Sequence, residues 1–285
     1  MAHRVALGAV LCDGPASPAL ADAVLIDTHC HLAANDFAAD RAAVVAAAQA
    51  VGVATLVVPA LSADGFAAVR DCCRRYPGCI PAYGIHPLCV GDAREEDLAE
   101  LRRWLEREAD SAQAPVAVGE IGLDFLVGPT DVERQQHFFL EQLRIARDAG
   151  LPVLLHTRRA IDQVLAGLRR IGVNGGIAHA FNGSRQQADE FLRIGCKLGY
   201  GGTLSQARAS RIRQLAATLP AEAIVLESDA PDMPPAWLAG GRNTPAELPR
   251  ILAILAELRA TAPIDLAATT SANARQVLPR LRLAG

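Results

Sequence analysis

Short apolar runs alternate with longer segments of helical character along most of this chain. In the segment 133–149, Phe139, Leu143 and Ala146 recur at the i, i+4 and i+7 spacing of one helix face, and a glycine follows at the C-terminal stop. The apolar runs between such segments have the length and the composition of buried strands. They lie at 24–29, 55–59, 80–85, 116–121, 152–156, 176–179, 196–200 and 223–229.

A strand followed by a helix, repeated eight times, predicts a closed parallel TIM (β/α)8 barrel of the α/β class. The alternative is a doubly wound open sheet, which normally has fewer strands and a phosphate-binding glycine loop after its first strand. Here the first apolar run ends in His-Cys-His instead. No Pro/Gly/Ser-rich linker divides the chain, so we expect one barrel domain over 24–285 and a flexible N-terminal extension over 1–23.

Composition and charge limit the expected location of the protein and the ways in which it can bind a substrate. The chain has 285 residues, of which 51% are hydrophobic, but no apolar run approaches the roughly 20 residues that span a bilayer, so no membrane association is expected. The seven cysteines are odd in number and lack C-x-x-C spacing, which indicates a reducing, cytoplasmic location. A formal net charge of -3 argues against broad neutralisation of duplex DNA, so a nucleic-acid substrate would be gripped locally. Nothing in the sequence indicates an obligate protein partner.

The strongest candidate chemistry is the pair His29 and His31 after the first apolar run. On a strand, residues i and i+2 point to the same side, so both imidazoles would face one place. A His-x-His pair at the end of a hydrophobic strand is half of a metal site. Cys30 would then face the other way, as a packing residue.

Further metal-ligand types stand at the ends of other predicted strands. In a parallel barrel these C-terminal ends converge on one face. The alternatives without a metal are a core role for His156 and a helix cap for His179. The two carboxylates are different, because burying a carboxylate costs free energy unless it is paired or bound to metal. Four imidazoles and two carboxylates are more ligands than one tetrahedral ion can bind. They suit two divalent ions roughly 3.5 to 4 Å apart. The complete set is His29, His31, Glu120, His156, His179 and Asp229.

Three more residues, His86, Arg158 and Asn182, are candidates for substrate contact at the same mouth. His86 follows the third run, where it would either contact substrate or support the ligands. Arg158, two residues past His156, would neutralise a phosphate oxygen through its planar fork of donors or lie solvated in the first helical turn. Asn182 and Ser184 precede the helix after the sixth strand, where a helix N-cap explains them as well as binding an anion does.

Six motifs in order resemble those of the TatD-type metal-dependent deoxyribonucleases, in the amidohydrolase superfamily. The resemblance runs from about residue 24 to the C-terminus and includes an Arg-Asn-x-Pro-Ala segment at 242–246 and a late asparagine, Asn273. The six are Asp-Thr-His-Cys-His-Leu at 27–32, Gly-Ile-His-Pro at 84–87, Gly-Glu-Ile-Gly-Leu-Asp at 119–124, His-Thr-Arg at 156–158, His-Ala-Phe-Asn-Gly-Ser at 179–184 and Glu-Ser-Asp-Ala-Pro at 227–231.

The resemblance implies a TIM barrel that hydrolyses phosphodiester bonds in DNA, often as a 3′ to 5′ exonuclease, on single-stranded or frayed 3′ ends. It implies two divalent ions, Mg, Mn or Zn. One would be held by His29, His31 and Asp229, the other by His156 and His179. Glu120 would bridge both ions, and Asp229 would also act as general base.

Two alternatives stay open. The same scaffold can hydrolyse a small ester, lactone or amide, but such relatives commonly bridge their metals with a carboxylated lysine on the fourth or fifth strand. The only lysine here, Lys197, opens the seventh. A non-catalytic metal-binding barrel is the other alternative.

Asp232 and Met233 stand where the family often has an aromatic residue, so the substrate preference is less firmly indicated than metal binding.

Overall fold

The computed structural model describes residues 24–127 and 131–281, and the predicted N-terminal extension, 1–23, lies outside them. All eight predicted strands are present, each beginning and ending within a few residues of its predicted bounds. They are β1 (Leu25–Asp27), β2 (Val53–Pro59), β3 (Cys79–Ala82), β4 (Val118–Asp124), β5 (Val153–Arg158), β6 (Gly176–Ala178), β7 (Cys196–Tyr200) and β8 (Ile224–Leu226).

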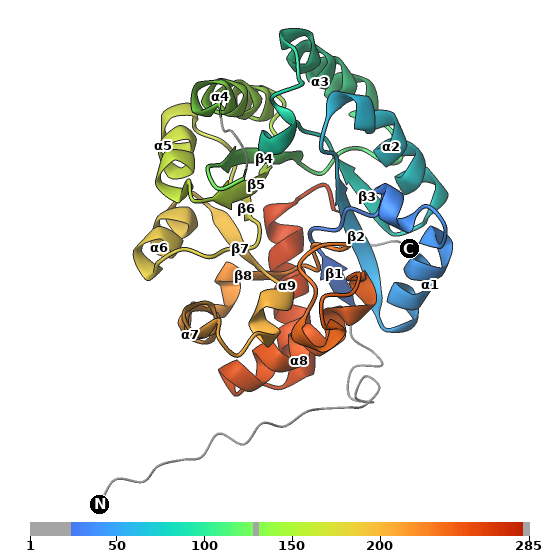
Figure 1. Ribbon diagram of the computed structural model, residues 1–285, viewed down its shortest axis with the longest axis vertical. Helices are drawn as coiled ribbons and strands as arrows, with labels where there is room; N and C mark the ends of the chain where they lie inside the picture. The colour runs from blue at the N-terminus through green and yellow to red at the C-terminus, as the bar shows by residue number, and fades with distance from the viewer. Residues whose placement is uncertain (1–23, 128–130, 282–285) are drawn as a thin grey trace, which may run out of the picture.

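Helices follow the strands in alternation and cover them from outside (Figure 1). The predicted helix 133–149 is α4, one residue earlier at each end. Apolar side chains of the strands and helices form one continuous layer between them. The helices are α1 (Arg41–Ala50), α2 (Phe66–Arg75), α3 (Glu95–Glu108), α4 (Val132–Asp148), α5 (Ile161–Ile171), α6 (Arg185–Arg193), α7 (Ser210–Thr218), α8 (Leu248–Arg259) and α9 (Pro263–Val277).

The strands pair in parallel and in sequence order, as β1-β2-β3 and as β4-β5-β6-β7-β8. Two seams join these sheets. Between β3 and β4, Tyr83 and Val118 form an isolated bridge, and Gly119 N donates to Tyr83 O at 2.9 Å. Between β8 and β1, Thr28 N donates to Leu226 O at 3.0 Å. The sheet therefore closes on itself, and the predicted TIM barrel is confirmed.

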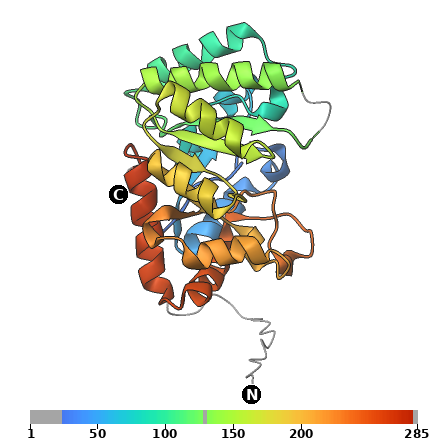
Figure 2. The same ribbon diagram turned by 90° about the vertical axis from the view of Figure 1, so that its left-hand side faces the viewer.

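Helix α9 adds a feature that the eightfold repeat does not predict. Its C-terminal residues Ala274 and Val277 pack with Leu278 against the inward-facing apolar side chains of the strands, such as Ile26 and Val225. Figure 2 shows α9, in red, lying along one end of the barrel. That end is sealed by apolar packing, so polar chemistry is left to the opposite, C-terminal end of the strands.

The secondary structure leaves no candidate for a membrane span. Within the parts of the chain that the structure describes, no helix combines the length and the apolar character needed to cross a bilayer.

Candidate metal centre

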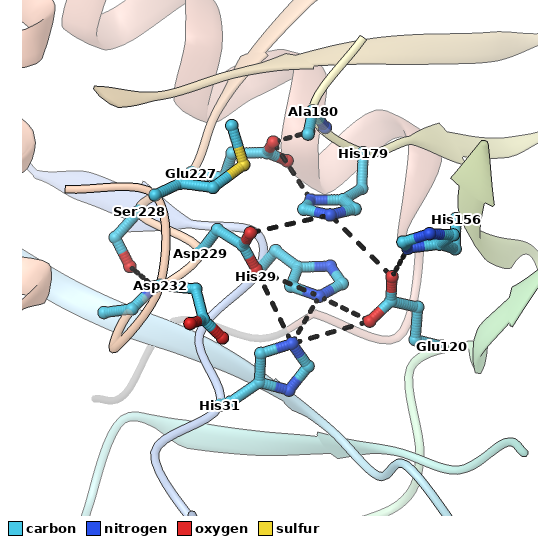
Figure 3. A network of polar contacts seen from close by, with 12 residues as sticks. His29, His31, Glu120, His156, His179, Ala180, Glu227, Ser228, Asp229 and Asp232 are labelled. Carbon is cyan, nitrogen blue, oxygen red and sulfur yellow. Dashed lines mark hydrogen bonds and ion pairs between the residues drawn. The ribbon is translucent and has the colours of Figure 1, made fainter. Parts of the chain in front are cut away.

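All six candidate ligands converge at the C-terminal ends of the strands (Figure 3). Two of them lie inside strands: Glu120 in β4 and His156 in β5. The other four lie in the loops that follow β1, β6 and β8, because these strands end one to four residues earlier than the ligands. The barrel thus brings together side chains that are up to two hundred positions apart.

Glu120 lies at the middle of the cluster and divides it into two halves. Its Oε2 lies 3.0 Å from His29 Nε2 and 3.5 Å from His31 Nε2. Its Oε1 lies 2.9 Å from His156 Nδ1 and 3.7 Å from His179 Nε2. The same Oε1 also lies 3.5 Å from His86 Nε2, so each carboxylate oxygen faces a different group of imidazoles.

Asp229 borders the same cluster from the β8 side. Its Oδ1 lies 3.5 Å from His31 Nε2 and 3.8 Å from His29 Nε2, and its Oδ2 lies 3.8 Å from His179 Nε2. The backbone at Asp229 adopts the left-handed conformation, with φ of 57°. Asp229 N donates to His29 O at 2.8 Å, so the β8 loop is tied directly to the loop that carries the His-x-His pair.

The geometry of His29 and His31 differs from the prediction. Strand β1 ends at Asp27, so neither histidine lies on a strand and the alternation argument does not apply to them. Their Nε2 atoms nevertheless approach to 3.3 Å, because the loop is fixed by backbone hydrogen bonds from Cys30 N to Val57 O and from His31 N to Ala230 O. Cys30 is fully buried in the apolar layer, which confirms its packing role.

Burial and charge act in opposite directions on the ionisable groups of the cluster. Burial alone would raise the pKa of Glu120, but electrostatic interactions and hydrogen bonding with the neighbouring imidazoles hold this pKa well below its usual value. Asp229 is affected in the same way, with a lowered pKa. Burial alone would lower the pKa of His179, but Asp229, Glu227 and Glu120 raise it to about 10. His29 differs from His179, because burial lowers its pKa.

The donor set fits divalent metal ions. Three groups of side chains offer ligand atoms that all lie within 4.8 Å of one another: His29, His31 and Glu120; His29, His179 and Asp229; and His86, Glu120 and His156. Imidazole and carboxylate donors at such spacing suit Zn²⁺, Mn²⁺ and related ions. These groups overlap and do not coincide with the partition that the resemblance implies, so the assignment of each residue to one ion stays a prediction.

The three candidate substrate contacts lie in different surroundings. His86 is buried in the cluster, with its Nε2 3.1 Å from His156 Nδ1 and its Nδ1 accepting from Leu88 N at 3.1 Å. Arg158 is exposed at the end of β5. Asn182 is also exposed, and its Oδ1 accepts from Arg211 Nη2 at 2.7 Å.

Ser184 resolves one of the alternatives that the sequence leaves open. Its hydroxyl accepts from Gln187 N at 3.2 Å, and Gln187 Oε1 accepts from Ser184 N at 2.9 Å. Ser184 therefore caps α6 in a capping box.

Two carboxylates were not among the predicted site residues although both lie inside the motifs. Asp124 is the last residue of the 119–124 motif, and its Oδ2 lies 3.0 Å from His156 Nε2. Glu227 is the first residue of the 227–231 motif, and its Oε1 lies 3.1 Å from His179 Nδ1. Both carboxylates are buried. In the sequence, only their place in the same motifs as the candidate ligands indicated a role at the site.

The sequence profile of the family described as TatD related DNase matches residues 26–279. The uncharacterized metal-dependent hydrolase YjjV of Escherichia coli is 40% identical over 235 residues, which cover 82% of this chain and 90% of that protein. The 3′-5′ ssDNA/RNA exonuclease TatD of Cronobacter sakazakii is 35% identical over 260 residues, with coverage of 89% and 97%.

Solved structures agree with these sequence matches. The crystal structure of Escherichia coli YjjV, a TatD homologue, superimposes with a TM-score of 0.86 at 38% identity, over 90% of this chain and 98% of that one. A hydrolase TatD family protein from Entamoeba histolytica superimposes with a TM-score of 0.79 at 18% identity, over 90% and 98% of the two chains, and supports the fold.

Proposed function

This chain belongs to the TatD-related DNase family of metal-dependent hydrolases, and on that premise we propose that it cleaves phosphodiester bonds of DNA as a 3′ to 5′ exonuclease with two divalent ions. The observation that carries the proposal is the central position of Glu120. One of its oxygens faces His29 and His31 and the other faces His156 and His179. A carboxylate whose two oxygens face two different groups of imidazoles can bridge two ions.

In this proposal, His29, His31 and Asp229 would hold one ion, His156 and His179 would hold the other, and Glu120 would serve both. The ions are Mg²⁺, Mn²⁺ or Zn²⁺. When bound, such ions polarise a phosphoryl oxygen and lower the pKa of water, so that a nucleophile forms at neutral pH.

Asp229 is the proposed general base. Its carboxylate borders both halves of the cluster, and its side chain keeps 12% of its surface exposed, so a water molecule in the mouth can reach it. Its pKa is lowered despite burial, which keeps it ionised and able to accept a proton at neutral pH.

The proposed substrate is a single-stranded or frayed 3′ end. The relative from Cronobacter sakazakii is described as a 3′-5′ ssDNA/RNA exonuclease. The exposed Arg158 at the end of β5 supplies a guanidinium that pairs with a phosphate oxygen beside the cluster. With a net charge of -3, the whole protein does not attract long polyanions, so contacts at the mouth carry the binding.

The test is an activity panel on a 3′-labelled single-stranded oligonucleotide with Mg²⁺, Mn²⁺ or Zn²⁺, beside a 5′-labelled strand, a duplex, a lactone and an acyl amide. We expect mononucleotides to be released from the 3′ end, and a chelator to abolish their release. Hydrolysis of the lactone or amide by the metal-loaded protein, without cleavage of any nucleic acid, would overturn the proposal.

A further inference from the structure

Glu227 lies on the outer side of the candidate metal centre, directly behind His179 (Figure 3). Its Oε1 lies 3.1 Å from His179 Nδ1 and also accepts a hydrogen bond from Ala180 N at 2.6 Å. Only 1% of the side chain is exposed, so water does not compete for this carboxylate. The contact joins the end of β8 to the loop after β6, which are 48 positions apart.

The two nitrogens of His179 have different partners. Nδ1 faces Glu227, whereas Nε2 points into the cluster, 3.7 Å from Glu120 Oε1 and 3.8 Å from Asp229 Oδ2. A neutral imidazole carries one N–H donor and one acceptor nitrogen, and a carboxylate can only accept. Glu227 therefore selects the form with the proton on Nδ1 and the lone pair on Nε2.

We propose that Glu227 is the positioning residue that holds His179 with its Nε2 lone pair directed into the metal centre. The inference rests on the proposed role of His179 as a metal ligand. A carboxylate on the far nitrogen fixes the ring orientation and increases the basicity of the ligating nitrogen, so it slows the loss of a bound ion.

Gly199 in β7 makes room for this carboxylate. A Cβ atom at position 199 would lie 2.0 Å from Glu227 Oε2, far inside van der Waals contact. The orientation of His179 matters beyond its own ligand atom, because its ring stacks on His29 with centroids 3.9 Å apart and planes at 19°. Glu227 thus supports one ligand directly and a second through ring packing.

A carboxylate behind the ring is not shared by all the candidate ligands. Within residues 24–127 and 131–281, Nδ1 of His29 and Nδ1 of His31 are both buried without a hydrogen-bond partner. His156 has such a partner in Asp124, at 3.0 Å. Within the described residues, a carboxylate behind the ring therefore supports two of the candidate ligands: His179, which follows β6, and His156, which lies in β5.

The test compares the full-length protein with its Glu227→Gln variant, both loaded with Zn²⁺. After addition of excess chelator, we expect the variant to release the ion about 10- to 100-fold faster, since the neutral amide keeps the shape but loses the charge. Glu108→Gln is the matched control, because Glu108 is also a buried glutamate but pairs with Arg74 away from the site. Equal release rates for wild type and Glu227→Gln would overturn the inference.

A second measurement needs no variant. ¹⁵N NMR of the zinc-loaded wild type should show the His179 proton on Nδ1, and a proton on Nε2 would overturn the inference even where Glu227→Gln fails to fold. Neither measurement uses nucleic acid. Faster zinc release from the variant, together with absence of DNA cleavage by the wild type, overturns the proposed substrate and leaves the role of Glu227 standing. DNA cleavage by the wild type, together with unchanged zinc release from the variant, overturns the role of Glu227 and leaves the proposed substrate standing.

Discussion

Asp124 and His156 form a contact on the outer side of the candidate metal centre, with Asp124 Oδ2 3.0 Å from His156 Nε2 and the other ring nitrogen, Nδ1, 2.9 Å from Glu120 Oε1. The remaining oxygen of Asp124 accepts from Leu126 N at 2.8 Å and from Val127 N at 3.1 Å. One carboxylate therefore fixes both a candidate ligand and the start of the loop after β4. His156 presents Nδ1 to the cluster, whereas His179 presents Nε2.

Asp124→Asn is expected to weaken metal binding about 10- to 100-fold, because the amide removes the negative charge that supports His156. Calorimetric titration of the metal-free protein with Zn²⁺ measures the affinity. Asp148→Asn, an exposed carboxylate beside Arg102 and Arg147, is the control and should bind as wild type does. An unchanged affinity for Asp124→Asn would contradict the expectation.

Asp229→Asn is expected to lower kcat by about 10²- to 10⁴-fold, the usual contribution of a general base. Asparagine is the residue of choice because it tolerates the left-handed backbone found at this position, so the loop should keep its shape. Single-turnover kinetics on the 3′-labelled strand provide the measurement. Asp148, an exposed carboxylate on α4 that pairs with Arg147, serves as control, and Asp148→Asn should retain the activity.

If the proposed two-ion centre forms, Glu120→Gln is expected to lower the ion content of the purified protein from two to at most one, because one carboxylate serves both halves of the cluster. Elemental analysis after dialysis against Zn²⁺ measures the content. The buried side chain keeps its volume in this variant, so the secondary structure should be retained. Full occupancy and full activity in the variant would show that Glu120 is not a bridge.

The metal-free protein is expected to lose thermal stability as the pH rises from about 7 to about 10. Burial alone would lower the pKa of His179, but Asp229, Glu227 and Glu120 raise it from 6.5 to about 10, and the pKa values of His31 and His156 are raised as well. The folded state then binds more protons than the unfolded state, so this stabilisation is complete below pH 6.5 and is lost through about pH 10. Thermal unfolding with a chelator across this range measures the loss. Zn²⁺ should flatten the curve, because the ion replaces the protons.

Gly199→Ala is expected to destabilise the fold by about 1 to 3 kcal/mol, the usual cost of overpacking. The new methyl group would overlap the Glu227 carboxylate, so zinc release should also become faster. Gly91→Ala is the matched control, since a Cβ at that position meets nothing within 4 Å. Denaturant unfolding compares the two variants, and equal stabilities would contradict the packing at Gly199.

The sequence by itself determined the strand order and the end of the barrel where the chemistry lies. Strand propensity and apolar periodicity are local properties, so runs such as 152–156 are recognisable without any partner. A parallel barrel gathers the C-terminal ends of its strands, which is why Glu120, His156 and Asp229 could be expected to meet.

Only the tertiary structure decided how these side chains are oriented. His29 and His31 converge through loop hydrogen bonds to β2 and to the β8 loop, and α9 seals the barrel by packing that no repeat pattern encodes. Glu227 and Asp124 contact their histidines across 48 and 32 positions. Such contacts form only when the closed barrel fixes the distance and direction between side chains, and a carboxylate that will support a ligand cannot be told from one that will face water before that closure.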